Sequence, residues 1–201
     1  MPRIVVFDLE TRKWASDLDP ENNDAGWDAL RAGKGGASAI CLWDSLDDWL
    51  YMYDDLSIQA VVKHLEAADV LVGYRSEKFD IPVIEGLIGR KLRIRYSYDL
   101  YTEMVRTLAD KGVVGSRGDF TLDAVAKRNL GLGKNGRGAD AKNLALQGRF
   151  GELFTYCGND VKLTRDLFFR VCRDGGLIEL AGRFVQMEVP EWVKSGVVRQ
   201  V

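Results

Sequence analysis

The sequence predicts an α/β fold with a central mixed β-sheet of about five strands flanked by α-helices. Two observations lead to this prediction. Short runs of β-branched and apolar residues dominate the first quarter of the chain. After residue 57, such runs alternate with stretches of helical periodicity. A length of 201 residues with 46% hydrophobic and 29% charged residues suits one globular domain over 1–201 with a substantial core.

Three strands are expected first, and they start the sheet either as a meander or in a Greek-key-like order. Residues 3–9 (RIVVFDL) form an unbroken apolar run typical of a buried strand. Residues 37–43 (ASAICLW) and 49–53 (WLYMY) follow as a hairpin joined by a short acidic link.

Residues 12–37 separate the first two strands and are rich in Asp, Asn and Gly. They are expected to form a long loop or insertion that Trp14 and Trp27 pin to the body. The sequence leaves open whether this segment is a lid, a substrate guide or a plain surface insertion.

The middle of the chain alternates between helix and strand. Ser57 begins a helix that runs to about residue 68. Residues 70–74 form a fourth strand, and a helix starts at about Asp80 with a proline in its first turn. A short fifth strand is expected at 93–98.

The rest of the chain is mostly helical. The segment from residue 176 to 201 is expected to be a C-terminal extension with a hairpin and a weakly specified tail. The expected helices cover residues 99–112, 121–131, 141–147 and 149–173, with a flexible basic loop at 131–138.

Charge and composition exclude several classes of function. One histidine, His64, at the boundary of an apolar helical stripe, argues against a His-rich zinc site or a His-based triad. Three cysteines without metal-ligand spacing are typical of reduced thiols. No apolar run is long enough to span a membrane, and the first residues do not resemble a secretory signal, so we expect a cytoplasmic protein.

The net charge of −2 hides an asymmetry along the chain. Residues 1–60 hold twelve acidic and five basic residues, whereas residues 111–149 hold eight basic and three acidic ones. Such a basic stretch is either a solvated surface or a phosphate-binding face.

Four carboxylates follow a suggestive order. Asp8 and Glu10 lie two apart at the end of the first strand, so both point to one face, where a divalent cation would neutralise them. Asp80 opens a helix, and Tyr156 precedes Asp160 by one helical turn. Each feature also has an ordinary interpretation, namely a strand that runs out into water, a helix N-cap, a core tyrosine and a surface acid.

Taken together, these residues resemble the three motifs of the DEDD superfamily of 3′-5′ exonucleases, which have the ribonuclease H-like fold. FDLET at 7–11 matches the first motif, and GYRSEKFD at 73–80 matches the second in its Gly, aromatic and Phe-Asp positions. YCGNDVKLTRDLF at 156–168 matches the third motif in its tyrosine subtype. The resemblance covers the chain from about residue 3 to residue 172. Within this family, the sequence is similar to the proofreading exonuclease domain of family B DNA polymerases.

The resemblance implies that Asp8, Glu10, Asp80 and Asp160 are ligands of two divalent metal ions, Mg²⁺ or Mn²⁺. Tyr156 would orient the attacking water, since a phenol with a pKa of about 10 is a poor general base at neutral pH. One departure is Arg75, which stands where the family usually has an Asn that holds the substrate. Arginine is itself a strong phosphate partner.

The implied function is hydrolysis of phosphodiester bonds from the 3′ end of nucleic acid, with single-stranded DNA as the expected substrate and nucleoside 5′-monophosphates as products. The alternative is a ribonuclease H-like module that binds nucleic acid with little or no cleavage. An α/β domain with coincidental acids is a third interpretation.

Partners follow from the same resemblance. Because 201 residues leave no room for a polymerase domain, we expect an exonuclease that acts alone or in trans with a polymerase or another replication or repair protein, in a bacterial or phage-infected cell. Expected nucleic-acid contacts are Leu9, Thr11, Arg75, Phe79, Lys127, Lys134, Arg137 and Lys142.

Overall fold

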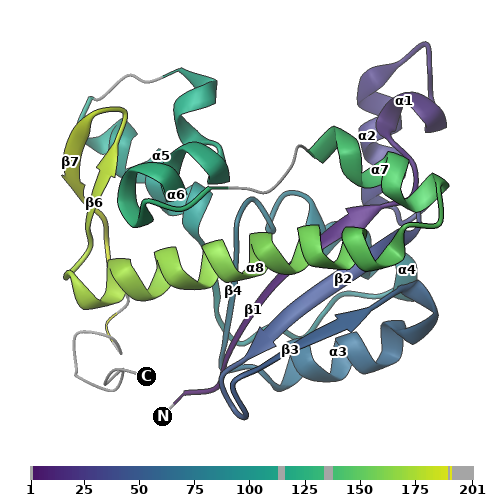
Figure 1. Ribbon diagram of the computed structural model, residues 1–201, viewed down its shortest axis with the longest axis horizontal. Helices are drawn as coiled ribbons and strands as arrows, with labels where there is room; N and C mark the ends of the chain where they lie inside the picture. The colour runs from purple at the N-terminus through teal and green to yellow at the C-terminus, as the bar shows by residue number, and fades with distance from the viewer. Residues whose placement is uncertain (1, 113–115, 134–137, 190, 192–201) are drawn as a thin grey trace.

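The computed structural model describes residues 2–112, 116–133, 138–189 and 191. Its centre is a five-stranded sheet with the order β3-β2-β1-β4-β5 (Figure 1). Strand β2 is antiparallel to both β1 and β3, whereas β4 is parallel to both β1 and β5, so the sheet is mixed as predicted. The strands are β1 (Ile4–Thr11), β2 (Ala37–Asp44), β3 (Trp49–Tyr53), β4 (Val70–Gly73) and β5 (Ser97–Asp99).

Helices cover both faces of the sheet. The long helix α8 crosses one face, and α3 and α4 cover the other (Figure 1). The α-helices are α1 (Ala15–Leu18), α2 (Asn23–Arg31), α3 (Ile58–Ala67), α4 (Asp80–Ile88), α5 (Leu100–Asp110), α6 (Leu122–Leu130), α7 (Gly138–Leu146) and α8 (Phe150–Arg173), and short 3₁₀ turns lie at Asp55–Ser57 and Arg117–Phe120.

The alternation of side chains along β1 divides the core in two. Ile4 and Val6 pack into the cluster that contains the buried face of α8. Val5, Phe7 and Leu9 pack into the other cluster, with α3 and α4. Because successive side chains on a strand point to opposite faces, the row begun by Ile4 and Val6 continues on the α8 side of the sheet beyond Phe7.

The segment between β1 and β2 differs from the expected long loop. Residues 12–37 include the short helix α1 and the nine-residue helix α2, which Asn22 caps by accepting a hydrogen bond from the Ala25 N–H. The two helices lie beside α7 at one edge of the molecule (Figure 1).

The fifth strand is shorter and later than predicted, at 97–99 instead of 93–98. Arg93 binds Glu66 through both its backbone N–H and its guanidinium, and Arg95 pairs with Asp69. Side-chain hydrogen bonds and ion pairs thus hold residues 93–95 in place, although the sequence pattern predicted that they would pair as a strand.

The hairpin predicted after residue 176 is present as β6 (Leu177–Leu180) and β7 (Arg183–Gln186). The Asn129 side chain joins it to α6, because it accepts from the Glu179 N–H at 2.8 Å and donates to the Glu179 carbonyl at 2.9 Å. Within the described ranges, no helix has the length and apolar composition needed to cross a membrane.

Candidate active site

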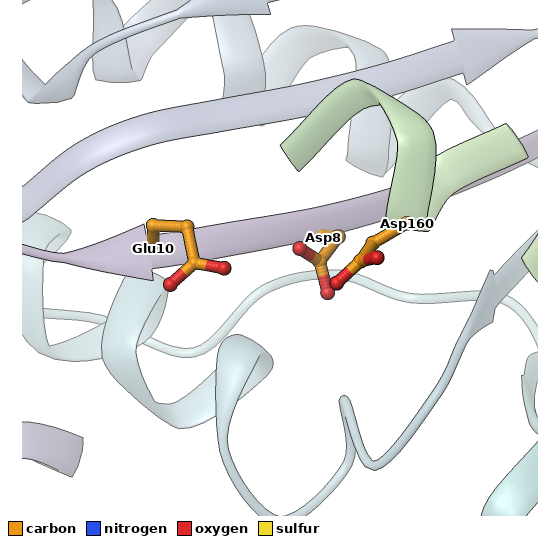
Figure 2. Close-up of side chains that lie close together, drawn as sticks. All are labelled: Asp8, Glu10 and Asp160. Carbon is orange, nitrogen blue, oxygen red and sulfur yellow. The ribbon is translucent and has the colours of Figure 1, made fainter. Parts of the chain in front are cut away.

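Three carboxylates meet where β1 passes under α8. Asp8 and Glu10 extend from β1 and Asp160 from α8, and one oxygen of each lies within 4.8 Å of the others (Figure 2). Asp160 is 2% exposed, and the other two are half-buried. Like charges at this spacing repel, and carboxylate oxygens are the donors that Mg²⁺ and Mn²⁺ prefer. The donor set therefore fits a hard divalent cation.

Packing between α8 and the sheet sets this geometry. Cys157 is fully buried, and its thiol donates to the Asp8 carbonyl at 3.4 Å. Because Asp160 follows Cys157 by about one helical turn, the contact that fixes the helix on the strand also brings the two aspartates together.

Asp80 comes from the other side of the sheet and binds the same strand. Strand β1 pairs with β4 only as far as Val6, so the next backbone groups on this edge have no strand partner. The Leu9 N–H donates to the Asp80 carboxylate at 3.1 Å and is thereby satisfied. Asp80 is the first residue within α4, after Phe79 at the N-cap, so the ordinary N-cap interpretation of Asp80 is wrong.

The environment of Asp80 opposes its ionisation. Burial is the main cause, and the charges of Asp99 and Asp160 add to it, so that together they raise the pKa of Asp80 to about 7. A bound cation would reverse this balance by favouring the carboxylate. Asp80 is thus a further acid poised beside the cluster of three.

A cleft of about 1020 Å³ joins these groups. All four motif carboxylates line it, together with Tyr156, which lies one turn before Asp160 and is 6% exposed. Its other lining residues are Leu9, Asn23, Asp24, Trp27, Asp28, Arg31, Tyr74, Arg75, Lys78, Phe79, Tyr101 and Thr102.

Arg75, the departure from the expected motif, lies on the wall of this cleft. Its backbone adopts a left-handed conformation, with φ of 66°, and its N–H donates to buried Asp99 at 3.1 Å. Its guanidinium stacks on the Tyr101 ring, 4.0 Å from the centroid. Its Nη2 is buried and donates to no acceptor in the described part of the chain. The Arg75 guanidinium therefore lies beside the acids of the cleft with a hydrogen-bond donor available for a ligand.

Among the other residues expected to contact nucleic acid, Leu9 and Phe79 line the cleft together with Arg75, whereas Thr11, Lys127 and Lys142 are not among its described lining residues. The Thr11 hydroxyl donates to the Lys13 carbonyl. Lys127 pairs with Asp123 on α6, and Lys142 pairs with Asp17. Lys134 and Arg137 lie outside the described residues.

Sequence reasoning missed several residues of the cleft wall. Trp27, Arg31 and Lys78 line it, together with Tyr74 and Tyr101. The sequence predicts that Trp27 pins the insertion to the body, and it leaves open whether the insertion is a lid, a substrate guide or a plain surface segment. The location of Trp27 depends on how α2 packs on α4, which no local pattern encodes.

Comparisons with known proteins support the fold. No family model and no curated protein matches the sequence. Among solved structures, the chain is similar to the family B DNA polymerase from the hyperthermophilic archaeon Pyrobaculum calidifontis, with a TM-score of 0.61 and 19% identity. The match covers 85% of this chain and 24% of the polymerase chain, so this protein spans about a quarter of the length of that polymerase.

This likeness confirms the predicted fold, an α/β arrangement of helices around a five-stranded mixed sheet. At 19% identity it shows the fold alone. The tyrosine subtype of the motifs stays a prediction.

Proposed function

We propose that the protein is a metal-dependent 3′-5′ exonuclease that removes nucleoside 5′-monophosphates from the 3′ end of nucleic acid, with single-stranded DNA as its main substrate. The observation that carries the proposal is the convergence of four acids, distant in sequence, on one cleft, three of them with oxygens within 4.8 Å of one another. A fold gains nothing from crowding four acids of which two are buried and two half-buried, so the cluster favours a site that meets a cation.

Asp8, Glu10 and Asp160, with Asp80 beside them, would hold two Mg²⁺ or Mn²⁺ ions, which supply charge stabilisation at the phosphate and a more acidic water. In the hydrolysis, water adds to the terminal phosphorus and the bond from phosphorus to the preceding 3′ oxygen breaks. The nucleotide leaves with its 5′-phosphate, and the shortened strand keeps a 3′ hydroxyl.

The protein's own groups would position the reactants. The phenolic oxygen of Tyr156, on the same helical face as Asp160, would accept a hydrogen bond from the attacking water and orient it. Leu9 and Phe79 would pack against the terminal nucleoside, and Arg75 would bind a phosphate oxygen. A polymerase or another replication or repair protein remains the proposed partner in trans.

Hydrolysis of end-labelled strands tests the proposal. Single-stranded DNA and RNA of one sequence, labelled at the 5′ end, are incubated with Mg²⁺, Mn²⁺ or EDTA, beside an Asp8→Ala control. We expect a ladder that shortens from the 3′ end and is absent in EDTA and in the variant. Binding without cleavage under either metal would contradict the proposal and favour a nucleic-acid-binding module, with Arg75 as the first residue to examine.

A further inference from the structure

Helix α2 forms a fixed wall of the cleft, and α1 packs against it. At one end, Lys142 of α7 donates to Asp17 of α1 at 2.7 Å and lies over the Trp14 ring. At the other end, the chain after α2 meets α4 backbone to backbone, because a β-carbon on Gly33 would lie 2.6 Å from the backbone of Gly86. The segment is therefore held from both sides, and its cleft-facing side chains are preorganised.

Trp27 is the large aromatic residue that α2 presents to the cleft. It is 39% exposed, and its ring meets Phe79 edge to face, with centroids 5.6 Å apart and an interplanar angle of 77°. Such a pair covers the face of only one of the two rings, so it leaves aromatic surface open to a further ring. Phe79 directly precedes Asp80, which places this surface beside the acids.

Two cations, Arg31 and Lys78, also line the cleft beside the aromatic pair. The Arg31 Nε donates to the Lys78 carbonyl at 3.1 Å, and its Nη1 pairs with Asp28, which lines the cleft as well. The Arg31 side chain is 42% exposed and the Lys78 residue is exposed as well. Aromatic rings interleaved with cations are the combination that binds the bases and the backbone of a single strand.

We infer that Trp27 stacks on an unpaired nucleobase near the 3′ end of the strand, and that the α1–α2 segment thereby makes the site specific for single-stranded ends. This inference rests on the proposed function and names the feature that selects its substrate. A base within a duplex has both faces covered by its neighbours, so it reaches Trp27 only after unstacking. Because every base has a π-face, the preference is for strandedness and tolerates any sequence.

Equilibrium binding tests the inference without hydrolysis. In the Asp8→Ala background with Mg²⁺, the affinity for a fluorescein-labelled oligothymidylate is compared for Trp27→Ala, Trp27→Phe and Trp49→Ala. Trp49 is the matched control, because it is 63% exposed on β3 and absent from the cleft lining. We expect Trp27→Ala to weaken binding about 5- to 100-fold, Trp27→Phe to restore most of the loss, and Trp49→Ala to change nothing.

The selectivity for single strands should change in parallel. Trp27→Ala should lose more affinity for the single strand than for a blunt duplex of the same length, so the ratio between the two affinities falls. Trp27→Ala within twofold of Trp49→Ala, or equal losses for single strand and duplex, would overturn the inference.

A photocrosslink on the unaltered Trp27 guards against a folding defect in the variant. Oligonucleotides with 5-iododeoxyuridine at one of the last three positions are irradiated on the protein, and the adduct is located by mass spectrometry. An adduct on Trp27 supports the inference, and adducts confined to other segments contradict it.

The failure of this inference and the failure of the proposed function can be told apart. Binding through Trp27 without cleavage by the wild type would refute the proposed exonuclease alone. Cleavage by the wild type together with unchanged binding by Trp27→Ala would refute only the stacking role.

Discussion

A buried carboxylate from another element lies near each end of strand β1, and the charges that surround the two carboxylates differ. Near its start, Asp44 of β2 is 1% exposed and is held by the Arg3 guanidinium, with Nε 3.1 Å from one oxygen, and by His64 at 3.0 Å. Near its end, Asp80 is 4% exposed and faces Asp99 and Asp160.

The consequences for protonation are opposite. Burial alone would raise the pKa of Asp44, but hydrogen bonds from Arg3 and His64 outweigh it and hold that pKa below its usual range. Burial and neighbouring acids raise the pKa of Asp80 to about 7. Removing one partner of a buried acid–base pair destabilises a fold, whereas acid crowded against acid costs stability and marks a site that something else must neutralise.

The largest expected difference between the two ends is in hydrolysis. Asp160→Asn should lower the rate of 3′-end cleavage at least about a hundredfold, because even partners outside the ligand shell cost 10- to 100-fold in such sites. Asp44→Asn should keep the wild-type rate per folded molecule. Initial rates on labelled single strands, with the folded fraction checked by circular dichroism, make the comparison. Equal losses of cleavage rate in the two variants would contradict the assignment of the active site to the end of β1 that lies beside Asp160.

Stability should change in opposite directions at the two ends. Asp44→Asn breaks charge-assisted hydrogen bonds, so the free energy of unfolding should fall by about 2 kcal/mol. Asp80→Asn keeps an oxygen to accept from the Leu9 N–H but removes a crowded charge, so at pH above 7 without metal it should raise that free energy by about 1–2 kcal/mol. Urea denaturation in EDTA measures both values. A destabilised Asp80→Asn protein would mean that Asp80 is stabilising as a carboxylate.

The smallest expected effect is the change with pH in the stability differences between wild type and the two variants. The lowered pKa of Asp44 gives stability that is present above the unfolded pKa of about 3.9 and is lost as pH falls through the folded value. The raised pKa of Asp80 has the reverse sign, so its contribution is lost as pH rises from about 4 through 7. The gap between wild type and Asp44→Asn should therefore shrink in acid, while the gap between wild type and Asp80→Asn should grow toward neutral pH. If the two stability differences changed with pH in the same direction, the opposite pKa shifts of Asp44 and Asp80 would be contradicted.

The parts of the site that local patterns encode could be predicted from the sequence. Strand alternation places Asp8 and Glu10 on one face, and helical spacing places Tyr156 above Asp160. The sheet and most helices follow from the same periodicities. Asp80 could be named as the start of a helix, but its bond to the Leu9 N–H depends on where β4 ends.

Long-range contacts explain what the sequence did not reveal. Helix α2 takes its place through the close approach of Gly33 and Gly86, so the sequence could not decide whether Trp27 and its segment guide the substrate or only cover the surface. His64 was expected at a boundary, and its pairing with Asp44 joins residues twenty apart on different elements. Ion pairs of Arg93 and Arg95 with distant acids likewise displaced the expected fifth strand.

Calorimetric titration of Mn²⁺ into the metal-free protein tests the central claim most directly, namely that the acid-crowded end of β1 is a divalent cation site. Wild type, Asp160→Asn and Asp44→Asn are titrated side by side near neutral pH. We predict saturable binding to wild type and Asp44→Asn, and its loss in Asp160→Asn. Equal Mn²⁺ binding by both variants, or none by the folded wild type, would contradict the claim.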